Sequence, residues 1–193
     1  MIIFIAVVCF LVISTQAQVP VKKCPDVTVV EDFNLTAYLG DWYEQARYPS
    51  SLEDRGICVY TNYAPNKLEG DTDLEDDNSV KSHTEFINSD TNEKSILDGV
   101  ATQDPDNAAK FILNLTNPID LSVPFWILGT DYTGFSVGFS CSEQNNVTGM
   151  SLFIQTRSPD PIQVDLDAAI KVIKDNNLPT AYLTQTEQDV CDY

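Results

Sequence analysis

The feature that most constrains the fold is a succession of eight strand-length segments joined by short, turn-rich stretches. These segments span residues 42–48, 57–63, 80–87, 94–102, 110–116, 125–132, 135–142 and 150–157. No helical period lies between them, and strands that follow one another in this way pair antiparallel with their neighbours. Eight such strands can close around one small ligand. The sequence therefore predicts an all-β fold, an eight-stranded antiparallel up-and-down barrel.

One helix is expected, after the last of these strands. Leu166, Ile170 and Ile173 form an apolar stripe at helical spacing. Asp165 and Asp167 are expected to supply the N-cap and negative charge in the first turn. Because a helix with a single apolar stripe buries that stripe, we expect one C-terminal α-helix on the outside of the barrel.

The first residues are typical of an export signal. An unbroken apolar run extends from Ile2 to Ile13 and is followed by Thr15-Gln16-Ala17, which suits signal-peptide cleavage. The run is shorter than the ~18 residues that a membrane span needs. We therefore expect residues 1–17 to be a signal peptide and residues 18–193 to form a single domain of a secreted, extracellular protein.

The charge of the chain restricts its partners. The formal net charge is −18 at pH 7. A surface this acidic repels phosphate backbones and anionic lipid headgroups. We expect no nucleic-acid partner and no membrane insertion, while a receptor or self-association stays open.

The predicted mature chain has four cysteines, Cys24, Cys58, Cys141 and Cys191. In an exported protein an even set indicates disulfides, and four cysteines allow three pairings. Zinc binding is not expected, because the sequence has no C-x-x-C motif and only one histidine. We therefore predict two disulfides and no metal.

Glycosylation sequons begin at Asn34, Asn114 and Asn146. An exported chain can use such triplets where they are exposed, although they also occur by chance. If Asn114 faces solvent, strand alternation points Phe111 and Leu113 towards the interior. That interior is then apolar.

Two residues far apart in the chain are candidates for the base of the barrel. Gly40 allows a turn before Trp42, and Arg157 ends the last strand-like segment. A guanidinium can lie flat on an indole face, so we expect Arg157 to pack against Trp42 where the first and last strands meet. A buried tryptophan and an unrelated surface arginine are the alternative interpretation.

Strand alternation extends this interpretation to a cavity. It places Glu44, Ala46 and Tyr48 on the Trp42 face, and Ser151, Phe153 and Gln155 on the Arg157 face. The expected ligand-binding residues are Glu44, Ala46, Tyr48, Phe111, Leu113, Phe125, Ile127, Ser151, Phe153 and Gln155. A barrel filled by side chains is the alternative, but the small residues Ala46, Gly138, Ser140 and Ser151 leave room.

Several motifs resemble the signature regions of the lipocalins. They are Gly40-x-Trp42-Tyr43, Thr130-Asp131-Tyr132 before a strand with Cys141, and Arg157 at the end of the last strand. Other segments are similar to the apolipoprotein D, insecticyanin and bilin-binding protein branch: Lys23-Cys24-Pro25, Asp32-Phe33-Asn34, Ala46-Arg47-Tyr48-Pro49 and residues 123–128. The resemblance covers nearly all of residues 18–193.

The resemblance implies a lipocalin calyx with a C-terminal helix and the pairings Cys24–Cys141 and Cys58–Cys191. It implies transport of small hydrophobic molecules such as biliverdin, fatty acids, steroids or carotenoids. No cofactor is required, and the bound molecule is expected to be biliverdin or a lipid. Phe153 stands where bilin and steroid carriers of this branch often have a pocket tryptophan, which makes a ligand that stacks on an indole doubtful.

Three other functions compete with a carrier. A haem protein would need His83, the only histidine, as axial ligand, although its neighbours are polar. An enzyme is not expected, because Glu44 has no Ser–His or Cys–His pair to accompany it. A protein-interaction role, as an inhibitor or in signalling, would use Trp126 if that side chain is exposed rather than packed under the helix or a loop.

Overall fold

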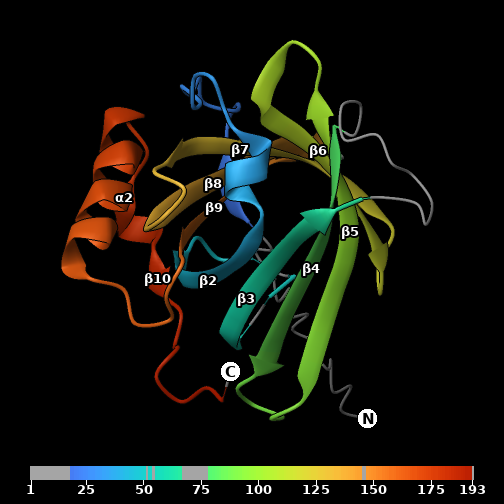
Figure 1. The fold of residues 1–193 in the computed structure, drawn as a ribbon, viewed down its shortest axis with the longest axis vertical. Coiled ribbons are helices and arrows are strands. Elements are labelled where there is room, and N and C mark those ends of the chain that lie inside the picture. The colour runs from blue at the N-terminus through green and yellow to red at the C-terminus, as the bar shows by residue number, and fades with distance from the viewer. Residues whose placement is uncertain (1–17, 51, 54, 67–77, 145–146, 193) are drawn as a thin grey trace, which may run out of the picture.

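Strands β2 to β9 form a closed antiparallel barrel (Figure 1). Their bounds are β2 Gly40–Arg47, β3 Gly56–Pro65, β4 Ser79–Asn88, β5 Lys94–Asp104, β6 Asn107–Asn117, β7 Leu121–Thr130, β8 Phe135–Gln144 and β9 Val147–Thr156. Each strand pairs with the next one in the chain, and β9 pairs back with β2 to close the sheet. The predicted eight-stranded up-and-down barrel is confirmed.

The structure is a computed structural model and describes residues 18–50, 52–53, 55–66, 78–144 and 147–192. The expected signal peptide, residues 1–17, and the sequon residue Asn146 lie outside the described residues. In the described part of the chain, no helix has the length and apolarity that crossing a membrane requires.

Four short elements were not predicted. Strand β1, Val19–Val21, pairs with the start of β9, and β10, Thr184–Gln185, pairs with the end of β2. A short helix α1, Leu35–Tyr38, precedes β2, and a 3-10 turn η1, Thr180–Tyr182, follows the long helix. Elements of two to four residues are too short to show a period in the sequence.

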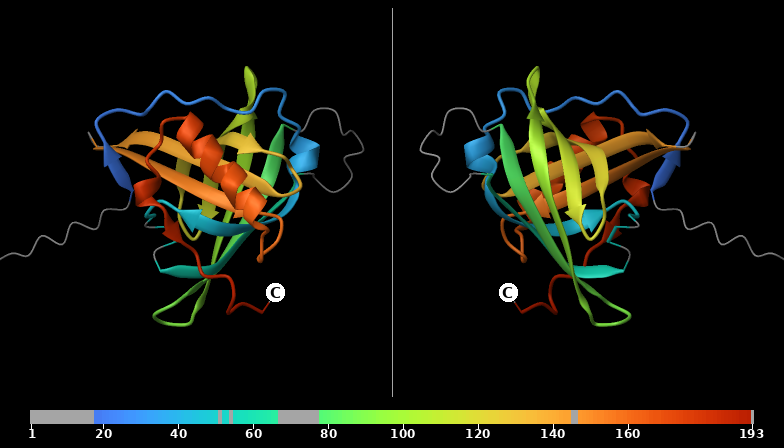
Figure 2. Two further views of the ribbon diagram at one scale, coloured as in Figure 1. Left: turned by 90° about the vertical axis from the view of Figure 1, so that its left-hand side faces the viewer. Right: turned by 90° about the vertical axis from the view of Figure 1, so that its right-hand side faces the viewer.

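Helix α2, Gln163–Asp175, lies across the outside of the barrel (Figure 2). Its fully buried residues Ala169 and Ile173 pack with Val137, Phe139 and Leu152 in an outer core. The expected N-cap at Asp165 is wrong, because the helix begins two residues earlier and its N-cap is Ile162. Asp165 is instead in the first turn, where its negative charge favours the helix dipole.

Two disulfides tie the ends of the chain to barrel strands. Cys24 of the N-terminal arm bonds to Cys141 in β8, and Cys191 of the C-terminal tail bonds to Cys58 in β3. The linked residues are separated by 117 and 133 positions in the sequence. These are the two pairings that the family resemblance implied.

Candidate ligand-binding site

The base of the barrel is closed by an indole and a guanidinium. The Arg157 guanidinium lies 3.8 Å from the centre of the fully buried Trp42 ring. Arg157 also donates hydrogen bonds to four backbone carbonyls, those of Ala37, Tyr38, Asp41 and Tyr132. Two of these carbonyls belong to α1, so the same side chain fixes the end of that helix over the base.

The chain before β2 completes this base. Phe33 and Tyr38 are buried against Trp42, and Leu35 is partly buried beside them. The Trp42 Nε1 atom donates a 2.9 Å hydrogen bond to the Tyr38 carbonyl. Gly40 has a φ of 97°, and a Cβ atom there would lie 3.3 Å from Arg157 Nη1. Glycine therefore allows both the turn and the approach of the guanidinium.

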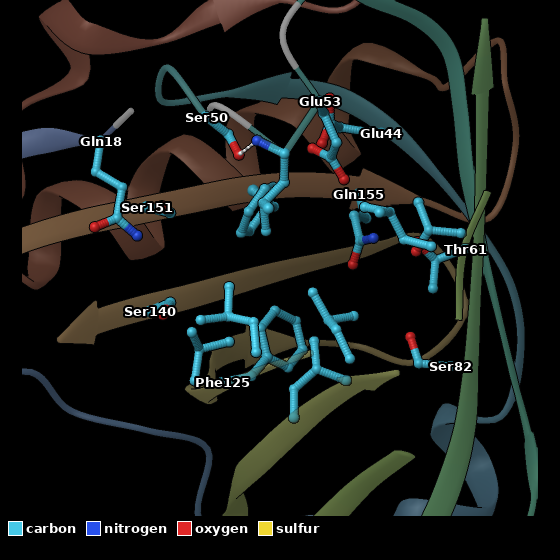
Figure 3. A pocket seen from close by; sticks show the side chains of 18 of the residues that line it. Gln18, Glu44, Ser50, Glu53, Thr61, Ser82, Phe125, Ser140, Ser151 and Gln155 are labelled. Atoms are coloured by element: carbon cyan, nitrogen blue, oxygen red, sulfur yellow. Dashed lines mark hydrogen bonds between the residues drawn. The ribbon is translucent and has the colours of Figure 1, made fainter. Parts of the chain in front are cut away.

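The interior of the barrel contains a cavity of about 410 Å³ (Figure 3). Its apolar lining comes from β5, β6, β7, β9 and the loop after β2, through Leu52, Leu97, Leu113, Leu115, Leu121, Val123, Phe125 and Phe153. Hydroxyl groups are scattered between them, from Ser50, Thr61, Ser82, Thr84, Ser140, Ser142 and Ser151. Pockets of this size and mostly apolar character suit small hydrophobic ligands.

One side of the cavity is polar. We call this side the polar wall; it consists of Glu44, Glu53 and Gln155 together with the side chains that hold them in place. Figure 3 shows Glu44, Glu53 and Gln155 together on that side, away from Gln18. Glu44 and Gln155 are cross-strand partners of β2 and β9. The exposed fractions of Glu44, Glu53 and Gln155 are 1%, 8% and 5%. Water therefore contributes little to the solvation of these groups.

Glu44 is held by neighbours from its own strand and from the C-terminal tail. The Arg47 guanidinium forms an ion pair with Glu44 Oε1, and the Thr186 hydroxyl donates to the same oxygen. Gln188 donates from Nε2 to the backbone carbonyls of Glu44 and Val59, at 2.6 and 2.8 Å. The tail that Cys191 anchors thus supports the polar wall from behind.

Arg47 is also tied to the loop after β2. Its Nη2 atom donates to the Glu53 carbonyl at 2.7 Å and to the Gly56 carbonyl at 3.1 Å. Its Nη1 atom donates to Thr186 as well as to Glu44. Because both terminal nitrogens are engaged, this buried guanidinium is a structural part of the wall.

Two acceptor atoms on this wall have no hydrogen-bond partner within the described residues, Glu53 Oε2 and Gln155 Oε1. Burial, with a further contribution from the neighbouring Glu44 carboxylate, raises the pKa of Glu53 to about 8, although Arg47 opposes the shift. Glu53 is therefore mostly neutral at pH 7. An unpartnered polar atom beside an apolar cavity is costly unless a ligand satisfies it.

The comparisons with known proteins agree with this architecture, although no protein-family model matches the chain. Apolipoprotein D of Cavia porcellus is 28% identical over 182 residues, which cover 88% of this chain and 84% of the relative. The Lazarillo protein of Schistocerca americana is 29% identical over 187 residues, covering 95% and 82%. The structure of insecticyanin from the tobacco hornworm Manduca sexta has a TM-score of 0.73 at 21% identity, covering 91% and 93%.

The chain belongs to the lipocalin family. Its curated relatives place it in the apolipoprotein D and insecticyanin branch. Its lipocalin homologues are binding and transport proteins, not enzymes.

Six of the ten residues predicted to contact ligand line the cavity of this lipocalin. They are Glu44, Leu113, Phe125, Ser151, Phe153 and Gln155. Two others, Phe111 and Ile127, also point inward but belong to the hydrophobic cluster around Trp42 at the base of the barrel. Their side chains form the floor of the barrel rather than the cavity lining.

The expectation that Ala46 and Tyr48 line the cavity is wrong. A register shift between Glu44 and Ala46 in the β2–β9 pairing reverses the alternation that Trp42 and Glu44 set. Tyr48 consequently joins the outer core under α2, where its hydroxyl donates to the Pro179 carbonyl at 2.7 Å. Arg47, which alternation placed outside, is buried against Glu44 instead.

Sequence reasoning missed four members of the polar wall: Arg47, Glu53, Thr186 and Gln188. The register shift in β2 moves Arg47 to the face opposite the one that strand alternation predicts. Glu53 lies in a loop, and hydrophobic periodicity does not predict the path of a loop. Thr186 and Gln188 are buried in the tail, but residues 184–189 are all polar. The sequence therefore contains no signal that could have identified them.

The residues behind the competing functions lie outside the cavity. His83 of β4 points away from it, with Nδ1 2.6 Å from Asp98 and Nε2 3.1 Å from Glu85. The Trp126 ring is partly buried on the outer core, 6.1 Å from Phe139. The described residues also contain no group of three or more metal-ligating side chains.

The described sequon residues are accessible. Asn34 is exposed at the N-cap of α1, and Asn114 is exposed on the outer face of β6. On the same strand Phe111 and Leu115 are buried and Leu113 lines the cavity, as the alternation from Asn114 predicted. Glycosylation of these positions stays a prediction.

Proposed function

We propose that this lipocalin is a secreted carrier that binds one small hydrophobic ligand inside the barrel. The observation that carries this proposal is the cavity of about 410 Å³ with its mostly leucine and phenylalanine lining. The volume falls in the range of about 300–1,000 Å³ that is typical of small-molecule sites. A closed base beneath a lined cavity also gives the ligand one enclosed chamber rather than a channel.

Secretion is supported by independent features of the chain. The two disulfides require an oxidising compartment to form and persist. The apolar segment before residue 18 has the composition of a signal peptide, and exposed sequons at Asn34 and Asn114 suit a glycoprotein. No cofactor is needed for this function, since binding itself is the activity.

The family resemblance suggests two ligand classes, a pigment such as biliverdin or a lipid such as a fatty acid or sterol. A haem ligand is less well supported, because His83 is paired on the outer surface of β4. A protein-interaction role through Trp126 is likewise weaker, because that ring packs against the outer core.

A cavity-filling variant tests the carrier proposal. Retinyl methyl ether, an uncharged apolar probe, should bind with one molecule per chain in equilibrium dialysis. Ser151→Phe places an aromatic ring in the cavity and should abolish binding, and Ser140→Phe should do the same from β8. Ile112→Phe, on the half-exposed outer face of β6, is the matched control and should bind like the original protein. Equal binding by all four proteins would contradict a cavity site.

A further inference from the structure

The polar wall of the cavity has acceptor atoms without donors. Glu53 Oε2 and Gln155 Oε1 are buried and lack a hydrogen-bond partner among the described residues. Both side chains line the cavity, and both adjoin Glu44, Gln155 as its cross-strand partner and Glu53 as its hydrogen-bonded neighbour. The two acceptors therefore belong to one small region of the lining.

This region offers no cation to a ligand. Glu44 and Glu53 are the acidic side chains among the described residues that line the cavity, and no lysine, arginine or histidine accompanies them there. The nearest cation, Arg47, already donates to Glu44, Thr186 and two backbone carbonyls. A ligand carboxylate placed here would meet carboxyl groups and acceptors, with no lysine, arginine or histidine in the described lining to neutralise it.

Resting on the proposed carrier function, we infer that the cavity selects apolar ligands that end in a hydrogen-bond donor without negative charge, a hydroxyl or an amine. The head group would donate to Glu53 Oε2 and Gln155 Oε1, while the apolar body lies against the leucines and Phe125. Carboxylates, which include fatty acids and biliverdin, are then disfavoured. Among the lipids and pigments suggested above, hydroxylated ones such as sterols fit best.

This selection is expected because a buried acceptor that stays without a hydrogen bond costs more free energy than a satisfied one gains. A ligand that offers a donor satisfies acceptors that were desolvated when the protein folded. A ligand of the same shape without a donor leaves them unsatisfied, and sites built to bond an O–H or N–H reject such analogues strongly. A carboxylate also brings a negative charge without a cationic partner to a poorly solvated position.

Four probes that share one polyene and differ in head group test this inference. Retinol carries a hydroxyl, retinylamine an ammonium, retinyl methyl ether neither donor nor charge, and retinoic acid a carboxylate. In equilibrium dialysis at pH 7, retinol and retinylamine should each bind at least about tenfold tighter than the ether. Retinoic acid should bind weakest. The ratio of retinol to retinylamine affinity then distinguishes a neutral alcohol from an amine as the preferred head group.

Two substitutions at one position separate charge from hydrogen bonding. Glu53→Gln keeps an acceptor oxygen and the side-chain size, so the preference for retinol over the ether should persist, while retinoic acid gains affinity from the new N–H donor. Glu53→Leu removes the acceptor, so that preference should fall below about threefold. Glu93→Gln removes a carboxylate from an exposed turn and is the matched control, with all ratios unchanged.

The outcomes separate this inference from the carrier proposal. If all four probes bind with affinities within about threefold, the carrier stands and the head-group selection is wrong. If retinoic acid binds tightest, the selection is reversed and the inference is overturned. If no probe binds the original protein, the carrier proposal itself fails, and the inference fails with it.

Discussion

The base of the barrel and the polar wall of the cavity each contain an arginine that donates several hydrogen bonds, but the two regions differ in which polar atoms lack a partner. At the base, Arg157 covers the Trp42 ring and saturates carbonyls from α1, β2 and the loop before β8. At the wall, Arg47 is equally engaged, yet Glu53 Oε2 and Gln155 Oε1 beside it lack a partner among the described residues.

This difference indicates two roles for similar chemistry. A region in which donors and acceptors match contributes to stability, since breaking any contact leaves a buried polar group unsatisfied. A region that keeps acceptors unmatched costs stability in the empty protein and recovers it when a ligand supplies the donor. We therefore expect substitutions at the base to act on folding, and substitutions at the wall to act on ligand choice.

The largest expected effect is at the base. Trp42→Ala removes a fully buried indole and should lower the free energy of unfolding by about 3–5 kcal/mol. Trp42→Phe keeps an aromatic ring for Arg157 and should cost less, mainly through loss of the Nε1 bond to the Tyr38 carbonyl. Denaturant unfolding measures both. A loss below about 1 kcal/mol for Trp42→Ala would show that the base is not a stability centre.

The next effect compares the two disulfides. Replacing Cys58 and Cys191 together by serine should lower the free energy of unfolding by about 2–4 kcal/mol, because a long loop is released. It should also weaken head-group discrimination, since the tail carries Thr186 to Glu44. Replacing Cys24 and Cys141 should cost similar stability and leave discrimination intact. Equal binding effects from both pairs would contradict a special role for the tail.

A smaller effect should appear in the pH dependence of stability. The pKa of Glu53 is raised from 4.5 to about 8, so its contribution is fully present below pH 4.5 and is lost as the pH rises through about 8. Glu44 and Arg47 face the same group and remain in the Glu53→Gln variant. That variant should therefore gain stability relative to the original protein between pH 4.5 and 8, measured by thermal unfolding. If the stabilities of the two proteins change in parallel with pH, Glu53 is solvated and its pKa is not raised.

The smallest effect is expected at His83. Its pKa is raised, first by its hydrogen bond to Asp98 and then by Glu85, so its stabilisation is present below pH 6.5 and is lost above the raised pKa. The side chain is 38% exposed, and water screens the pairs, so His83→Gln should change stability by less than about 1 kcal/mol. Binding of retinyl methyl ether should not change. Weaker binding by the variant would contradict the position of His83 outside the cavity.

Much of the barrel could be predicted from the sequence, because each sequence signal was local or strictly periodic. Alternation from Asn114 oriented β6 correctly, and the stripe of Leu166, Ile170 and Ile173 identified α2. The pairing of Trp42 with Arg157 could be predicted because few contacts suit both an indole and a guanidinium.

The polar wall was harder to predict because it depends on a bulge and on long-range contacts. One irregularity between Glu44 and Ala46 moved Tyr48 out of the predicted site and Arg47 into it. Thr186 reaches Glu44 across 142 residues of sequence. Strand alternation cannot anticipate either event, since it assumes an unbroken pleat and considers one strand at a time.

The most direct test of the central claim is to identify what the protein carries. The lipocalin would be purified from its native source, its absorption spectrum recorded, and the molecules that an organic solvent extracts analysed by mass spectrometry. We predict one apolar molecule per chain with a hydroxyl or amine head group and no carboxylate. A bound fatty acid or biliverdin would contradict the head-group selection, and an extract without any stoichiometric hydrophobic molecule, together with failure to bind the retinoid probes, would contradict the carrier function.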